Sequence, residues 1–163
     1  HGVDGVGLAK IMAEADLTVG TFYTHFKSKE ALLQAALRQS LQARNEALRQ
    51  ALLAGDLELA IRTYLSEEHR DAPGEGCPVA ALAAEVARHP RPTRKAFASE
   101  VELGLDVLVE CLSQRRGAPV SRADGAAFFG LLVGTLQLAR ATPDAAASTA
   151  ILEAGIRAAL VLA

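Results

Sequence analysis

Aromatic residues and cysteine are scarce in this sequence. Aromatic side chains make up 4% of its 163 residues, tryptophan is absent, and apolar residues together reach 50%, so we expect an aliphatic core. The two cysteines, Cys77 and Cys111, are too few for a disulfide-stabilised secreted domain. No signal-peptide pattern opens the chain, and its longest apolar stretch, residues 126–139, is too short to cross a bilayer. These absences predict a cytoplasmic protein with no membrane partner.

Patterns of catalytic and metal-binding residues are missing as well. No histidine is paired with another His or Cys at the spacing of a metal site; the four are His1, His25, His69 and His89. The sequence has no strand followed by a glycine-rich phosphate loop, and no serine nucleophile elbow. We therefore expect no enzyme, no metal site and no cofactor.

No stretch of useful length alternates apolar and polar residues as a strand does. Apolar residues recur instead at helical spacing, between residues that cap or break helices. The expected helices cover residues 7–15, 17–26, 28–54, 56–65, 77–89, 93–116, 121–142 and 144–163. The sequence thus predicts an all-α fold.

Residues 17–29 contain no acidic side chain, although acids outnumber bases by 19 to 17 in the whole chain. Wound as a helix, this stretch places Val19, Phe22 and Phe26 on one face. The opposite face carries small or hydrogen-bonding residues, namely Gly20, Thr21, Thr24 and His25. Such a surface suits contact with phosphates and base edges. Because the net charge is -2, any DNA contact must depend on this local surface.

Gly20 and the preceding residues strengthen this interpretation. A glycine inside a helix costs about 1 kcal/mol relative to alanine, so either a closely packed second helix or an approaching DNA strand should compensate. The helix at 7–15 is followed by a turn in which Asp16 tolerates a left-handed backbone and Thr18 can cap the next helix. Helix, short turn and helix form the helix-turn-helix arrangement, whose second helix enters the major groove.

The residues of this unit form a specific pattern: Ile11-Met12, Ala15-Asp16, Thr18, Gly20-Thr21, Tyr23-Thr24-His25-Phe26 and Ser28-Lys29-Glu30. The pattern resembles the DNA-binding domain of the TetR family of one-component transcriptional regulators, over roughly the first thirty residues. Asp16 departs from the glycine usual in that turn, and Gly7 from the Ser or Thr that often opens this helix. The family has a further helix before this point. The sequence begins at His1, in the loop that would follow it, so we expect that helix to be absent here.

The resemblance implies a helix-turn-helix DNA-binding domain in residues 1–40 and a larger ligand-binding and dimerisation domain in residues 41–163. It implies a regulator, most simply a repressor, that binds a palindromic operator as a homodimer and is released by a small-molecule inducer. The residues expected to contact DNA are Thr18, Val19, Gly20, Thr21, Tyr23, Thr24, His25 and Lys29. Of these, Tyr23, His25 and Lys29 resemble the family's phosphate-contacting positions.

The last two expected helices are apolar on nearly every side and carry small residues at four-residue intervals. A chain of this length cannot cover both helices completely, so a symmetric dimer through them is the economical arrangement. The alternative is a hairpin buried by the chain's own helices. TetR-like regulators dimerise through their last two helices, so the resemblance implies the same dimer. The residues expected at the interface are Gly130, Leu131, Gly134, Ala150, Leu152, Ala154 and Ile156.

Ligand binding is an expectation from the resemblance, supported by a composition that could enclose an apolar cavity. The residues expected to line it are Tyr64, His69, Phe97, Glu100, Val101, Phe128 and Gln137. For each of them an ordinary place in the core is the alternative.

Cys77 offers a different mode of sensing, because it stands where a helix begins, and the positive end of a helix favours the thiolate. The Gly-Cys-Pro opening also resembles a subgroup of TetR-like regulators, some of which sense electrophiles or oxidants. The alternatives are a structural cysteine at Cys77, a helical small-molecule-binding protein without DNA binding, and a helical dimer that acts through protein partners. The last two leave the acid-free face unexplained.

Overall fold

The computed structural model describes residues 2–3, 5–53 and 55–163, and within them it contains nine helices and no strand. The helices are α1 (Leu8–Glu14), α2 (Val19–His25), α3 (Lys29–Leu53), α4 (Leu57–Tyr64), α5 (Glu67–Asp71), α6 (Pro78–Val86), α7 (Arg91–Arg116), α8 (Arg122–Ala141) and α9 (Ala145–Leu162). The all-helical prediction is confirmed.

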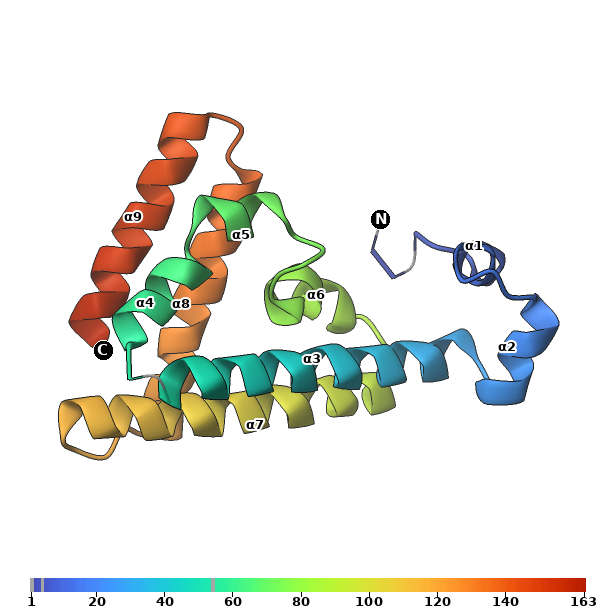
Figure 1. Cartoon of the computed structure of the whole chain (residues 1–163), viewed down its shortest axis with the longest axis horizontal. Coiled ribbons are helices and arrows are strands. Elements are labelled where there is room, and N and C mark those ends of the chain that lie inside the picture. The colour runs from blue at the N-terminus through green and yellow to red at the C-terminus, as the bar shows by residue number, and fades with distance from the viewer. Residues whose placement is uncertain (1, 4, 54) are drawn as a thin grey trace.

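Figure 1 shows α3 and α7 side by side along the length of the molecule, with α1 and α2 at one end of α3. At the other end α8 rises from the level of α7 and packs against α9, while α4, α5 and α6 lie on the side of α3 opposite to α7. The domain boundary expected at residue 40 falls inside α3, which runs without interruption from Lys29 to Leu53. One continuous helix thus connects α1 and α2 with the bundle.

Most helix starts follow from local capping. The side chains of Thr18, Asp56, Ser121 and Asp144 each accept a hydrogen bond from the backbone N–H three residues further on. One helix was not predicted. The chain leaves helical geometry after Tyr64, close to the expected end at residue 65, and Ser66 then caps the separate short helix α5 through a bond from the His69 N–H.

Two apolar cores hold the bundle together. The larger one joins α3, α4, α6, α7, α8 and α9, and its most deeply buried side chains include Leu41, Ile61, Leu112 and Leu136. The smaller one lies nearer to α1 and contains Leu33, Leu37 and Val86, with Val3 packed against it. The stretch before α1 is thus attached directly to the body of the protein.

Helix α9 corrects the estimate of apolar length made from the sequence. Residues 145–162 have a mean hydropathy of 1.5 and are long and apolar enough to cross a membrane, yet only 22% of this window is buried within the chain. Length and composition alone do not distinguish a membrane helix from one that packs against another protein.

Candidate nucleic-acid interface

The turn between α1 and α2 has the geometry expected of a helix-turn-helix unit. Asp16 adopts the left-handed conformation, with φ 55°. The Thr18 hydroxyl accepts a hydrogen bond from the Thr21 N–H at 3.2 Å, which caps the first turn of α2. An aspartate tolerates this conformation better than most residues, so it can replace the usual glycine without changing the turn.

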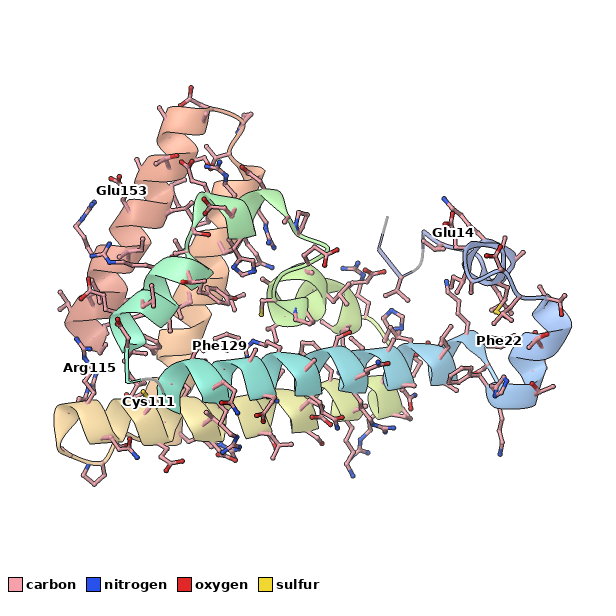
Figure 2. All side chains as sticks on the ribbon, in the orientation of Figure 1. Glu14, Phe22, Cys111, Arg115, Phe129 and Glu153 are labelled. Atoms are coloured by element: carbon pink, nitrogen blue, oxygen red, sulfur yellow. The ribbon has the colours of Figure 1, made fainter. Side chains whose placement is uncertain are left out.

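One aromatic ring anchors α2 from behind. Phe22 is 2% exposed, stacks against Phe26 with ring centroids 5.7 Å apart, and meets the edge of Tyr23 at 5.1 Å (Figure 2). The other two residues of this face differ in part from the expectation. Phe26 follows the end of the helix in an extended conformation but still stacks on Phe22, and Val19 is 40% exposed. Attachment of α2 therefore depends on Phe22 more than on the predicted apolar stripe.

The opposite face of α2, which we call the reading face, is open. A methyl group built on Gly20 would lie 3.5 Å from the Thr18 hydroxyl and within 4 Å of no other described neighbour. Close helix packing therefore does not explain this glycine. Residues Thr18, Thr24 and His25 are exposed, and Tyr23 is 63% exposed. The reading face thus leaves the backbone of α2 accessible at Gly20, among hydroxyl groups that can hydrogen-bond.

The basic residues around α2 differ from the expectation in one case. Lys29 is half-buried, and its Nζ donates a hydrogen bond to the Val3 carbonyl at 2.6 Å. This ammonium group is thus engaged in holding the stretch before α1. Lys10 on α1 and Lys27, two residues beyond α2, are exposed and can meet phosphates. Neither was among the residues expected to contact DNA.

Three of the residues expected to bind ligand or sense oxidants form one cluster. The Tyr64 and His69 rings meet edge to face at 4.9 Å, and the Cys77 N–H donates a hydrogen bond to His69 Nε2 at 2.9 Å. Burial, and next the nearby Cys77, raise the pKa of Tyr64 well above its usual range. Burial also lowers the pKa of His69. A neutral imidazole is required for the bond that Nε2 accepts.

Two further side chains complete this cluster. The ring centroid of Phe129 on α8 (Figure 2) lies 6.3 Å from that of Tyr64, and the Arg44 guanidinium of α3 lies over the Phe129 ring, 4.6 Å from its centroid. Neither Phe129 nor Arg44 was among the residues expected to bind ligand. The contact matters because it connects α3, which carries α2, with α8.

The other residues expected to bind ligand are spread over the bundle. Glu100 is 7% exposed and accepts a hydrogen bond from Gln42 on α3 at 3.0 Å, while Gln137 donates to the Ala80 carbonyl on α6 at 2.9 Å. Phe97 and Val101 are half-buried against the large core. Phe128 lies elsewhere, beside Leu112 and Leu162 in a surface cavity of 270 Å³. The structure therefore brings Tyr64 and His69 together and separates Phe128 from them.

The outer faces of α8 and α9 are uncovered. Gly130, Ala150 and Ala154 are exposed, Leu138 is 62% exposed and Val161 86%. Methyl groups built on Gly130 or Gly134 would meet nothing described within 4 Å. Figure 2 shows Glu153 of α9 directed away from the bundle.

The alternative in which α8 and α9 form a hairpin buried by the chain's own helices is thus wrong. Among the residues expected at a dimer interface, Leu152 is also wrongly placed. It is 2% exposed and packs inside its own chain. Gly134, Leu131 and Ile156 are half-buried, at the edge of the uncovered surface.

A capped turn, a ring-anchored second helix and an open, acid-free face define a helix-turn-helix DNA-binding unit. Residues 1–36 match the family described as "Bacterial regulatory proteins, tetR family". The solved structure described as "Crystal structure of E.coli NemR reduced form" has the same fold, with a TM-score of 0.78 and 22% sequence identity over 98% of this chain and 87% of that chain. No curated protein sequence matches. The protein is a transcriptional regulator whose DNA-binding region is that of the TetR family.

Proposed function

We propose that this regulator is a repressor that binds a palindromic operator as a homodimer and is released by a small molecule. The observation that carries the proposal is the reading face, where Gly20 opens the α2 backbone to an approaching duplex and no protein neighbour accounts for it. Thr21 and Thr24 flank this opening for contacts with base edges, and Tyr23 and His25 lie where phosphates would pass.

The uncovered faces of α8 and α9 support the dimer. Small residues on both helices allow a second copy to approach closely, and a symmetric interface would cover the exposed Leu138 and Val161. This use of α9 also accounts for its apolar surface without a membrane, in keeping with a cytoplasmic protein. We call α1 and α2 of each copy, with the stretch before them, the DNA-binding head. Two such heads related by a two-fold axis require a palindromic operator.

Unsatisfied polar atoms inside the bundle support a ligand. In the part of the chain that the structure describes, the buried Tyr64 hydroxyl and Glu100 Oε2 have no ordinary hydrogen-bond partner. Such atoms are costly unless something else bonds to them. A ligand that bonds to these atoms on α4 and α7 would shift the position of α3, which packs against both helices, to the extent that it binds one arrangement more tightly than the other.

Selection of duplexes from a random pool by the full-length protein tests the DNA part, and we expect palindromic sequences to be enriched. Gly20→Ala then separates two roles of this position. Because nothing packs there, alanine should stabilise the free protein by up to about 1 kcal/mol. The same methyl group should weaken binding to the selected duplex about tenfold, because it stands between α2 and the base edges. Thermal unfolding and duplex titration measure the two effects.

Gly74→Ala is the matched control, because Gly74 lies in an exposed loop with open space around it. It should leave duplex affinity unchanged. A Gly20→Ala protein that is less stable than wild type, yet binds the duplex equally well, would contradict the assignment of the reading face.

Sensing of oxidants or electrophiles through Cys77 is a second candidate. The thiol lies next to the Tyr64 hydroxyl at the start of α6, and the similar E. coli structure is described as a reduced form. At 4% exposure it reacts only with a small reagent or after local opening. On this proposal a maleimide lowers operator affinity in wild type and in Cys111→Ser, but not in Cys77→Ser. An effect that persists in Cys77→Ser eliminates the candidate.

A further inference from the structure

The corner between α6 and α7 holds the DNA-binding head at two separate points. At the first point, the Val3 N–H donates a hydrogen bond to Glu85 Oε1 at 2.7 Å. Lys29 Nζ holds the carbonyl of the same residue at 2.6 Å. Both backbone groups of Val3 are therefore held, the N–H by Glu85 of α6 and the carbonyl by Lys29, the first residue of α3.

Gly2 shows how closely this stretch approaches the corner. It has φ +70°, and a methyl group built on it would lie 2.8 Å from Glu85 Oε2. No other residue fits there without moving the carboxylate or straining the backbone. The side chain of Val3 packs on the core formed by Leu33, Leu37 and Val86. The contact with Glu85 is thus part of a packed site.

The second point lies on the first turns of α3. Glu30 accepts hydrogen bonds from the Thr93 hydroxyl and from His89 Nδ1, the latter at 3.2 Å. Gln34 Nε2 donates to the Thr93 hydroxyl at 3.0 Å. Thr93 is fully buried, so its hydroxyl depends on these partners. Loss of the hydroxyl would leave Glu30 and Gln34 without their shared contact.

From this geometry we infer that Glu85 and Thr93 are positioning residues. They set the tilt of the DNA-binding head relative to the helical bundle. The first point ties the stretch before α1 to α6, and the second ties the start of α3, just after α2, to Thr93 of α7. Contacts on both sides of α1 and α2 thus oppose a rotation of these helices relative to the bundle. The separation of the two reading helices in a dimer depends on this tilt and must match the separation of the half-sites. The inference rests on the proposed function for its DNA measurement only.

The test compares two duplexes with the full-length protein: the selected operator, and the same operator with one base pair added between the half-sites. Wild type should strongly prefer the first. Glu85→Ala should weaken binding to the selected operator about tenfold and change binding to the lengthened operator much less. The ratio of the two affinities should therefore fall. Glu85→Gln keeps an oxygen that can accept the Val3 N–H and should restore the preference. Glu75→Ala, which removes an exposed carboxylate before α6, should match wild type.

Thr93→Val and Thr93→Ser test the second point independently. We expect Thr93→Val to lose the preference for the selected operator and Thr93→Ser, which keeps the hydroxyl, to retain it. Equal loss on both duplexes would indicate a merely structural role and overturn the inference, and so would an unchanged preference in Glu85→Ala and Thr93→Val. A wild-type protein that selects no duplex defeats the proposed function but leaves the inference testable.

In that case nitroxide labels at Lys10→Cys and Glu102→Cys, with both native cysteines replaced by serine and the labelled protein diluted in unlabelled protein, report the distance between head and bundle. A broader distance distribution in Glu85→Ala than in wild type supports the inference, and identical distributions refute it.

Discussion

Phe22→Ala should abolish operator binding while the bundle from α3 to α9 stays folded. The Phe22 ring is 2% exposed, and its only deeply buried companion within α1 and α2 is Met12 at 6%. Removing a buried phenylalanine costs about 3–5 kcal/mol. The small head has few other contacts to retain α2, so we expect operator affinity to fall by about a thousandfold, which corresponds to roughly 4 kcal/mol.

Hydrogen exchange resolves where this effect arises. In Phe22→Ala the amides of residues 8–25 should lose protection, while those of α8 and α9 keep it, because α1 and α2 lie at the far end of the molecule (Figure 1). Tyr23→Ala is the matched control, since Tyr23 is the neighbouring ring and is 63% exposed. It should lower affinity moderately with no change in exchange. Wild-type affinity in Phe22→Ala would show that α2 is held by other contacts.

The sequence was most informative where structure is local. The capped starts at Thr18 and Asp56, and the left-handed Asp16, depend on residues within one turn of the chain. The end of α4 agrees with the expected helix 56–65, but the short helix α5 was not predicted, because five residues are too few to show a helical period. Only the hydrogen bond from the His69 N–H to the Ser66 hydroxyl makes Ser66 a cap.

Contacts between distant residues could not be read in this way. The bond from Val3 to Glu85 joins residues 82 positions apart, and the bond from Lys29 to the Val3 carbonyl was equally unforeseen. Periodicity also failed to separate the two faces of α9. Leu152 and Ala154 belong to the same apolar helix, but the first is buried in its own chain and the second is exposed.

Gly130→Arg should separate the dimer, because it places a charge on the exposed face of α8. Gly130 is exposed on α8, and nothing described lies within 4 Å of a methyl group built there. The arginine therefore has room in a single chain, and replacing a helical glycine should even favour α8 by up to about 1 kcal/mol. In a dimer the same side chain would meet the partner's apolar surface, where an unpaired charge is strongly unfavourable.

Dissociation should therefore occur without unfolding. Sedimentation should show a monomer, and its thermal midpoint at low concentration should be no lower than that of wild type. Operator affinity should fall by about a hundredfold or more, because only one DNA-binding unit can then bind at a time. Ala98→Arg, on an exposed position of α7, introduces the same side chain away from α8 and α9 and should remain dimeric. If Gly130→Arg stays dimeric, the interface lies elsewhere. If it becomes monomeric yet binds the palindrome as tightly as before, the two half-sites are not read together, and the uncovered faces of α8 and α9 serve another purpose.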